Sequence, residues 1–396
     1  MFGSWLVEQN NDRRCGELAS YQAWHQLEVR QYKVIPTNTG VSVQRQCPEY
    51  FERSMNVVEG INSDKVTAWL QDQVPHLQAP ITFSLIAGGH SNLTYLGVDR
   101  SGSQFVLRRP PLGHVLESAH DMGREYKIIS ALEHADVPVP KTYGLCRDLE
   151  VNDAPFYVMD FIGGQVLNDS VVGLKVAPQH RRGIGLHVID ILSKLHSLNP
   201  DAVGLGDLGR KEAYLSRQIN RWTKQWVASK THEIPEMEES CRILTETMPD
   251  QIGATIVHGD YRLGNMIVNG DKVDAILDWE LCTLGDPLAD VGYLLNNWVS
   301  PGEIELPGEG DQSPTAVGGY PERQELCDIY SANTGRDLSQ INYYRAFSHW
   351  RLAAIGQGVY KRYLTGAMGE DRDVDLEKQK NGVLRRAQAA LALLQT

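Results

Sequence analysis

A short β segment interrupts the helical patterns that fill the second half of the chain. It runs from Ile256 to Asp278, and its two apolar runs flank Asn269-Gly270, a hairpin turn signal. A hairpin that turns there returns Asp278 close to the level of Asn265. We therefore expect Asp260, Asn265 and Asp278 to converge in one small volume at the mouth of an apolar hairpin.

These three side chains point to phosphoryl transfer. Polar and anionic groups gathered beside apolar strands are costly unless a cation joins them. Mg²⁺ fits because it takes one or two protein ligands together with phosphate oxygens. The spacing Asp260-x4-Asn265 also matches the kinase catalytic loop, in which the Asp receives the proton of the substrate hydroxyl and the Asn holds a metal ion. The alternative is a loop whose polar side chains only cap turns.

The segment before this hairpin is patterned as a small, mostly antiparallel sheet with one helix packed on it. Strand patterns cover residues 81–86, 93–98, 104–108, 141–146 and 156–161. A capping pattern starts the helix at Ser118, and the helix passes through Glu125. Beyond Gly163-Gly164 helical periodicity dominates. The sequence predicts a flexible arm over 1–54, a first lobe over 55–162 and a second lobe over 163–396.

Charge and composition exclude several classes of function. The chain carries 38 basic and 50 acidic residues, a formal net charge of −12, which disfavours binding to a nucleic-acid backbone. No segment approaches the ~18 consecutive apolar residues of a membrane span. The six cysteines are scattered, with no C-x-x-C pair and no secretory signal. We expect a cytoplasmic protein with reduced thiols that acts on a small molecule.

The β segment resembles a known family. Residues 256–279 are similar to the aminoglycoside phosphotransferase and choline kinase branch of the protein-kinase-like fold, whose marks are H-G-D-x4-N followed by I-D-W/F-E. The resemblance spans about residues 80–365. Within that branch, residues 88–95, 105–111 and 284–290 resemble the phosphotransferase domain fused to some acyl-CoA dehydrogenases and its free-standing bacterial relatives.

The resemblance implies an α+β, two-lobed fold with an N-terminal antiparallel sheet plus helix and a larger, mostly helical C-terminal lobe. ATP would bind at the lobe junction, with Asp260 as the catalytic residue and Asn265 and Asp278 as Mg²⁺ ligands. Glu125 would pair with a basic residue on the third strand. Most of this fold uses Lys there, whereas this chain offers Arg108, which can hold Glu125 and a phosphate but is not an equivalent residue. The alternative for Arg108 is an ordinary exposed strand arginine.

Two further stretches are candidates for contacts with ATP. The loop from Gly88 to Tyr95 lacks a G-x-G-x-x-G pattern, but glycines such as Gly89 permit close backbone approach to phosphate. In the same loop Ser91 and Asn92 can donate hydrogen bonds; a plain hairpin turn would look the same. Residues 156–163, with Asp160 and Ile162, occupy the position of the hinge, where adenine would bind the backbone. A buried strand is equally compatible with this stretch.

We expect other polar residues to hold the loops around Asp260 and Asp278 in place rather than to take part in the chemistry. We expect Asp286 to brace the loop after Asp278, and Asp290 to orient the catalytic loop. His258 fixes the loop of Asp260 rather than acting as an acid or base. The aromatic helix predicted over 343–363 is mostly core, although its Arg345, Arg351 and Lys361 are positioned to meet an anionic substrate.

The resulting hypothesis is a kinase that uses ATP and Mg²⁺ on a hydroxyl acceptor. For the fused relatives the resemblance suggests hydroxylated acyl-CoA substrates. The alternatives are an aminoglycoside, choline or homoserine kinase, and a pseudokinase that binds nucleotide and acts by interaction. A cationic acceptor would require an acidic pocket. The clearest acidic cluster in the sequence lies in a loop patterned like ordinary protein surface: Glu303, Glu305, Glu309 and Asp311. The sequence leaves the oligomeric state open.

Overall fold

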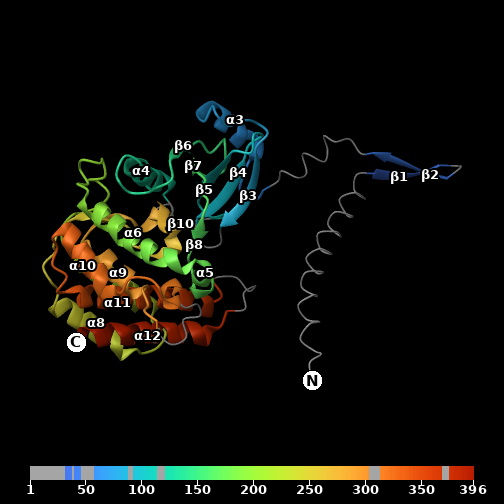
Figure 1. Ribbon diagram of the computed structural model, residues 1–396. Coiled ribbons are helices and arrows are strands. Elements are labelled where there is room, and N and C mark those ends of the chain that lie inside the picture. Colours follow the sequence, from blue (N-terminus) through green and yellow to red (C-terminus); the bar gives the residue numbers. More distant parts are fainter. Residues whose placement is uncertain are drawn as a thin grey trace, which may run out of the picture.

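The computed structural model describes residues 32–37, 40–45, 58–87, 92–113, 121–301, 303, 313–367 and 374–396. The arm predicted over 1–54 therefore lies largely outside the described residues. Within it the structure describes β1 (Tyr32–Thr37) and β2 (Gly40–Arg45), which pair with each other as an antiparallel hairpin. The rest of the described chain forms a sheet followed by a mostly helical region (Figure 1).

The first region is a five-stranded antiparallel sheet with the order β3-β4-β5-β7-β6. Its strands are β3 (Thr82–Ala87), β4 (Leu93–Val98), β5 (Gln104–Arg109), β6 (Thr142–Cys146) and β7 (Phe156–Asp160). Two helices accompany the sheet, α3 (Ser63–Gln73) and α4 (Met122–Leu132). Asp121 accepts a hydrogen bond from the Arg124 N–H and is the N-cap of α4. The helix therefore begins later than the sequence predicts, and Ser118 lies outside the described residues.

Alternation along β5 separates the two faces of this sheet. Phe105 and Leu107 belong to the core shared with Leu70 of α3, whereas Val106 belongs to the core shared with Ile128 of α4. Because successive side chains of a strand point to opposite faces, Arg108 follows Val106 towards α4. The sequence pattern thereby delivers a cation to the face that looks towards the helical region.

The second region consists of helices around a long central one, α11 (Ile341–Leu364), which packs against α7, α8, α9 and α12. The other helices are α5 (Ser170–Lys175), α6 (Pro178–Ser197), α7 (Tyr214–Ser229), α8 (Pro235–Glu246), α9 (Leu288–Asn296), α10 (Arg323–Thr334) and α12 (Leu376–Leu394). One hydrophobic core runs from the α4 face of the sheet into these helices. None of the helices in the described residues is long and apolar enough to cross a membrane.

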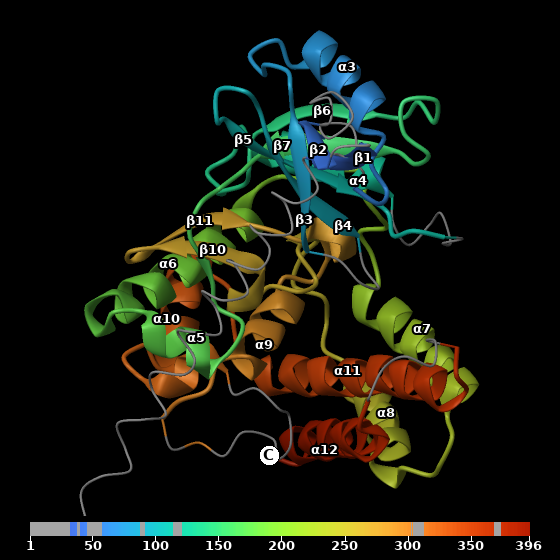
Figure 2. The same cartoon turned by 90° about the vertical axis from the view of Figure 1, so that its right-hand side faces the viewer.

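Short strands connect the two regions. They are β8 (Gln165–Val166), β9 (Thr255–Val257), β10 (Met266–Asn269), β11 (Lys272–Ile276) and β12 (Thr283–Gly285). Three short 3₁₀ turns complete the region: η2 (Leu263–Asn265), η3 (Trp279–Leu281) and η4 (Pro314–Val317). Figure 2 shows β10 and β11 between the sheet and the helices. The arrangement confirms the predicted two-lobed α+β fold.

The predicted hairpin forms between β10 and β11, with one correction to its turn. Asn269 pairs with Lys272, so the two turn residues are Gly270 and Asp271 rather than Asn269 and Gly270. Gly270 has a φ of 59°, the left-handed conformation that glycine adopts without a steric penalty. The Leu277 N–H donates to the Asn265 carbonyl over 2.9 Å, so the hairpin returns to Asn265 as the sequence predicts.

Candidate active site

The loop that carries Asp260 is held in place by hydrogen bonds to a buried carboxylate. Asp290, 1% exposed, accepts hydrogen bonds from the N–H groups of His258 (2.6 Å) and Gly259 (2.8 Å). Gly259 has a φ of 84°, and a Cβ there would lie 2.9 Å from the Leu281 carbonyl oxygen, so the turn requires glycine. The Arg351 guanidinium donates to the Gly259 carbonyl over 2.9 Å. Asp290 thus orients the loop, as the sequence suggests.

His258 links this loop to the end of β11. Its Nδ1 accepts from the Asp260 N–H over 3.2 Å, and its Nε2 lies 2.9 Å from the Leu277 carbonyl oxygen. Both contacts fit the neutral tautomer with the proton on Nε2. The imidazole also packs 4.6 Å from the Trp279 ring, centroid to centroid. His258 therefore fixes backbone positions and presents no ring nitrogen to a substrate.

The Asp260 carboxylate is oriented by three neighbours. Asn265 Nδ2 donates to Oδ2 over 2.6 Å, the Tyr293 hydroxyl donates to Oδ1, and Arg262 Nε lies 3.5 Å from Oδ1. Burial and the Asp260 charge raise the pKa of Tyr293 above its ordinary value, which keeps that hydroxyl protonated as a donor. Tyr293 comes from α9 and has no marker in the sequence that links it to Asp260.

Asn265 and Asp278 have the donor set that Mg²⁺ needs. The side-chain nitrogen of Asn265 donates both to the Asp260 carboxylate (2.6 Å) and to the Asp260 carbonyl (2.9 Å). Its amide oxygen remains as an acceptor. Asp278 adopts a left-handed conformation (φ 66°), uncommon for a residue other than glycine and frequent at functional sites. The described residues hold no cluster of three His, Cys, Asp or Glu. A magnesium ion here would take these two ligands and complete its shell with phosphate oxygens and water.

Arg108 connects the sheet to Asp278. Its Nε lies 3.1 Å from Glu125 Oε2, and its terminal nitrogens lie 2.7 Å from Asp278 Oδ1 and 3.3 Å from Thr94 Oγ1. Burial opposes the positive charge, but Glu125 and Asp278 raise the pKa of Arg108 above its ordinary value. The arginine therefore bridges a carboxylate from each lobe. It is not an exposed strand residue, because 14% of its side chain is exposed.

The neighbouring Arg109 faces the opposite side of β5. It bonds to the Gly60 carbonyl and to Asp153, 2.6 Å away, beside α3. Arg109 therefore cannot replace Arg108 at the cleft. Glu280, two residues after Asp278, is a charged group that the sequence reasoning passed over. Burial and the Asp278 charge raise the pKa of Glu280 to about 7.

The remaining predicted nucleotide contacts are spread along the sheet edge. Asn92 Nδ2 lies 3.5 Å from Glu125 Oε2, which places Asn92 beside the Arg108 network. Asp160 accepts from the Tyr143 hydroxyl, so its side chain supports β6. Ile162 makes no backbone–backbone hydrogen bond to another described residue. Gly89 and Ser91 lie outside the described residues.

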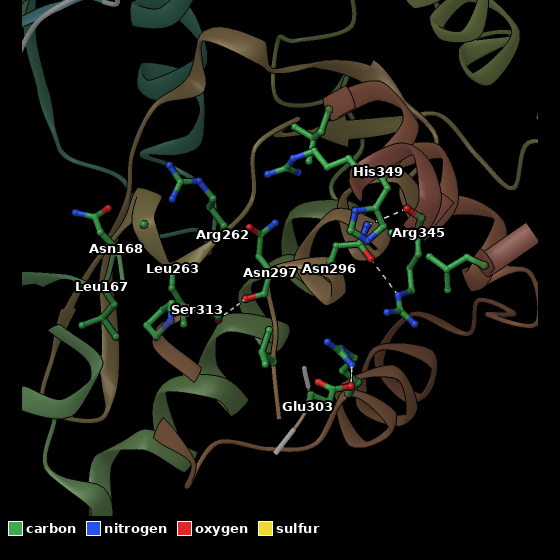
Figure 3. Close-up of a pocket in the computed structure, with 18 of the residues that line it drawn as sticks. Leu167, Asn168, Arg262, Leu263, Asn296, Asn297, Glu303, Ser313, Arg345 and His349 are labelled. Atoms are coloured by element: carbon green, nitrogen blue, oxygen red, sulfur yellow. Dashed lines mark hydrogen bonds and ion pairs between the residues drawn. The ribbon is translucent and has the colours of Figure 1, made fainter. Parts of the chain in front are cut away.

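A cavity of about 380 Å³ lies in the helical region, lined in part by Arg262 and Leu263 of the segment that follows Asp260. Figure 3 shows Arg262 on one side of it and Arg345 and His349, both from α11, on the other. Of the three cations predicted on this helix, only Arg345 lines the cavity. Arg351 is turned to Gly259, and Lys361 donates to the Ala228 carbonyl over 2.7 Å.

Comparisons with known proteins agree with this geometry. The sequence model of the family described as "Phosphotransferase enzyme family" matches residues 82–326. Acyl-CoA dehydrogenase family member 10 of Mus musculus is 39% identical over 322 residues, which cover 80% of this chain and 29% of that protein. The chain spans less than half the length of the curated relatives it matches, including family member 11 of Homo sapiens, 34% identical over 295 residues.

Solved structures give the same picture. A protein of Ralstonia eutropha, whose description proposes an aminoglycoside phosphotransferase, is 33% identical with a TM-score of 0.71, over 84% of this chain and 98% of its own. The streptomycin–ATP complex of an aminoglycoside phosphotransferase is similar in fold alone, with 15% identity and a TM-score of 0.53 over 81% of this chain and 99% of its own.

Proposed function

The chain belongs to the phosphotransferase enzyme family, and from this premise we propose that it is a magnesium-dependent kinase that transfers the γ-phosphate of ATP to a hydroxyl group of a small molecule. The observation that carries the proposal is the set of hydrogen bonds that links Asp260, Asn265 and the segment that leads into Asp278. Asn265 donates to Asp260, while its backbone carbonyl holds the residue before Asp278. The solved aminoglycoside phosphotransferase with ATP supports the choice of nucleotide.

Each lobe has its own task in this proposal. Residues 55–162 hold the nucleotide, with Arg108 held by Glu125 and directed to the phosphates. Asn92, Asp160 and Ile162 are further proposed contacts, as are Gly89 and Ser91, which lie outside the described residues. Residues 163–396 hold the acceptor and the transfer chemistry. When bound, Mg²⁺ supplies positive charge that neutralises the phosphate oxygens. Asn265 and Asp278 would hold it.

Asp260 acts on the acceptor. Its carboxylate orients the hydroxyl and accepts the hydroxyl proton as the oxygen–phosphorus bond forms and ADP leaves. Tyr293 and Asn265 each donate to one carboxylate oxygen, so they hold the group in one rotamer. Positioning and charge neutralisation supply most of the rate in this reaction class, and the observed hydrogen bonds supply positioning.

For the acceptor we propose a hydroxyacyl-CoA or a related hydroxy acid. The similarity to the acyl-CoA dehydrogenase family members supports this class, as do the arginines of the cavity beside Asp260. Aminoglycosides and choline are cationic and need carboxylates where this cavity presents guanidinium groups. A pseudokinase would not need the Asp260 carboxylate so fully oriented.

The test is a transfer assay with ATP and Mg²⁺. The acceptors offered in turn are hydroxyacyl-CoAs, hydroxy acids, homoserine, choline and aminoglycosides. ADP release is followed, and mass spectrometry of the products detects an added phosphate. We expect transfer to the hydroxyacyl class, abolished in Asp260→Asn. Nucleotide binding without transfer to any acceptor would instead favour a pseudokinase.

A further inference from the structure

The cavity beside Asp260 concentrates positive charge in a chain whose net charge is −12. Its charged lining comes from three helices and two loops: Arg262, Glu303, Arg323, Arg345 and Arg386. Among the described lining residues, four guanidinium groups therefore accompany one carboxylate. Like charges collected at a partly buried site repel one another, and the arrangement is stabilised when an anion joins it.

Glu303, the carboxylate among the described lining residues, already has hydrogen-bond and ionic partners. Glu303 pairs with Arg323 and accepts from the Ser300 N–H over 2.8 Å. Arg262 is directed to Asp260. These contacts leave the charge of Arg345 without a carboxylate of its own among the described residues.

Arg345 is held in place but is not satisfied. Its Nε donates to Asn296 Oδ1 over 3.1 Å, and Asn296 donates back to the Arg345 carbonyl over 2.8 Å (Figure 3). Its two terminal nitrogens have no hydrogen-bond partner in the described part of the chain. Burial and Arg323 lower the pKa of Arg345, the opposite of the direction found for Arg108. A rigid guanidinium with two donors directed into a cavity suits a carboxylate or a phosphate.

His349, one helical turn after Arg345, is a second unsatisfied group in the same wall. It is 8% exposed, lines the cavity, and its Nδ1 has no hydrogen-bond partner. Burial and the arginines Arg386, Arg345 and Arg323 lower its pKa to about 3, so the imidazole is neutral. A buried imidazole nitrogen without a partner is costly, and an acidic group or its water shell would supply one.

We propose that this cavity is the subsite that recognises an anionic group of the acceptor, a carboxylate or a phosphate, through Arg345 with Arg386 and His349, and so presents the acceptor hydroxyl to Asp260. The inference rests on the proposed function. The lining residue Arg262 lies 3.5 Å from Asp260 Oδ1, so one wall of the cavity borders the Asp260 carboxylate. An acceptor with its anion at α11 would extend past Arg262 to bring its hydroxyl to Asp260.

The test compares charged and uncharged forms of one hydroxyacyl acceptor: the free acid, the methyl ester, the pantetheine thioester and the CoA thioester. In wild type we expect the acid or the CoA thioester to be preferred over the uncharged forms. Preference for the acid identifies a carboxylate as the ligand. Preference for the CoA thioester over the pantetheine thioester identifies the CoA phosphates.

Arg345→Gln should raise KM for the preferred charged acceptor ~10- to 100-fold, the loss expected for hydrogen bonds to a charged group. Its kcat, its KM for ATP and its rate with the uncharged ester should stay within about threefold of wild type. Arg345→Lys should recover part of the affinity because the charge returns without the two-donor geometry. The control Arg242→Gln, on the exposed face of α8, removes a paired surface arginine and should change none of these values.

Two results would overturn the proposal. One is a wild type that prefers the uncharged forms. The other is an Arg345→Gln variant whose acceptor KM is unchanged but whose thermal stability is reduced. In that case a variant in which Glu305, Glu309 and Asp311 are neutralised should lose thermal stability in the same way. These three residues lie outside the described part of the chain, and that result would make them the structural counterions of the arginines.

A binding measurement separates this inference from the proposed function. Nucleotide-free protein is titrated calorimetrically with the free hydroxy acid and with inorganic phosphate. We expect binding that Arg345→Gln removes and Arg108→Gln retains, even where no acceptor is phosphorylated. Absence of transfer with this binding pattern rejects the kinase assignment alone. Binding that Arg345→Gln does not weaken rejects the anion subsite alone.

Discussion

Arg108 and Arg345 are both partly buried arginines on either side of Asp260, the proposed catalytic residue, but their surroundings are opposite. Arg108 lies between Glu125 and Asp278 and also donates to Thr94. Arg345 lies among other arginines, and an asparagine is its side-chain partner. On one side of Asp260 an arginine is therefore neutralised by carboxylates, and on the other side an arginine has no carboxylate partner among the described residues.

This difference indicates what each side has to bind. On the nucleotide side Arg108 is already paired with the carboxylates of Glu125 and Asp278, so the phosphates need additional positive charge there. A magnesium ion held by Asp278 and Asn265 would provide it. On the acceptor side positive charge is in excess, so the missing partner is an anion. The predictions below test this division, starting at the residue between the two sides.

Asp260→Asn should produce the largest effect. The substitution keeps the shape of the side chain but removes the group that accepts the hydroxyl proton, a role worth ~10²–10⁴ in rate. We expect kcat to fall by that factor while affinities for ATP·Mg²⁺ and for the acceptor stay near wild type. Single-turnover rates and equilibrium titrations measure the two quantities separately. Loss of ATP·Mg²⁺ binding in this variant would place Asp260 on the nucleotide side instead.

Asp278→Asn should affect the nucleotide side alone. It removes the carboxylate that would bind the metal ion and also one partner of Arg108. We expect ATP affinity in the presence of Mg²⁺ to weaken ~10- to 100-fold, with a higher Mg²⁺ requirement. ATP titrations with and without Mg²⁺ give the result. An acceptor KM that rises as much as the ATP dissociation constant would contradict the division between the sides.

The two sides also differ in how far the sequence predicts them. Asp260 and Asn265 come just before the hairpin of β10 and β11, and Asp278 comes just after it, so their proximity follows from local spacing and a turn signal. The pairing of Arg108 with Glu125 follows from the resemblance to the kinase-like family, and alternation along β5 places Arg108 on the face towards α4. Local spacing and strand alternation are short-range rules.

The acceptor side depends on how distant helices pack. At 3.6 residues per turn, Arg345, Arg351 and Lys361 point in different directions from α11, but the helix alone does not say which one faces the site. Packing of α9 and α12 against α11 selects Arg345 and brings in Arg386. Tyr293 reaches Asp260 for the same reason. No local sequence pattern encodes these contacts.

Arg108→Ala tests whether the pairing of Arg108 with Glu125 and Asp278 serves the nucleotide. We expect ATP affinity to fall ~10-fold, because a charge-assisted contact to phosphate is lost, and turnover to fall with it. The buried Glu125, 3% exposed, also loses its ionic partner, so thermal unfolding should occur at a lower temperature. Arg108→Lys is the matched variant, and it should retain charge but hold only one of the two carboxylates firmly. Unchanged ATP affinity in both variants would assign Arg108 to joining the lobes alone.

His349 gives the smallest and most specific effect, on stability. Its folded-state pKa of about 3 lies below the unfolded-state value of 6.5, so only the unfolded chain takes up a proton as the pH falls through 6.5. The stability due to neutral His349 is therefore complete above that pH and is lost below it, by ~1.4 kcal/mol per pH unit down to about pH 3.

His349→Gln should remove this dependence. Between about pH 7.5 and pH 5.5, the decrease in the free energy of unfolding should be ~1.4 kcal/mol smaller in the variant than in wild type. Denaturant unfolding at both pH values measures the difference. Burial is the main cause of the low pKa of His349, and Arg386, Arg345 and Arg323 lower it further, so Arg345→Gln should shift the dependence in the same direction by a smaller amount. An equal decrease in wild type and His349→Gln would mean that folding does not lower the pKa of His349, and neither burial nor the neighbouring arginines would then act on the imidazole.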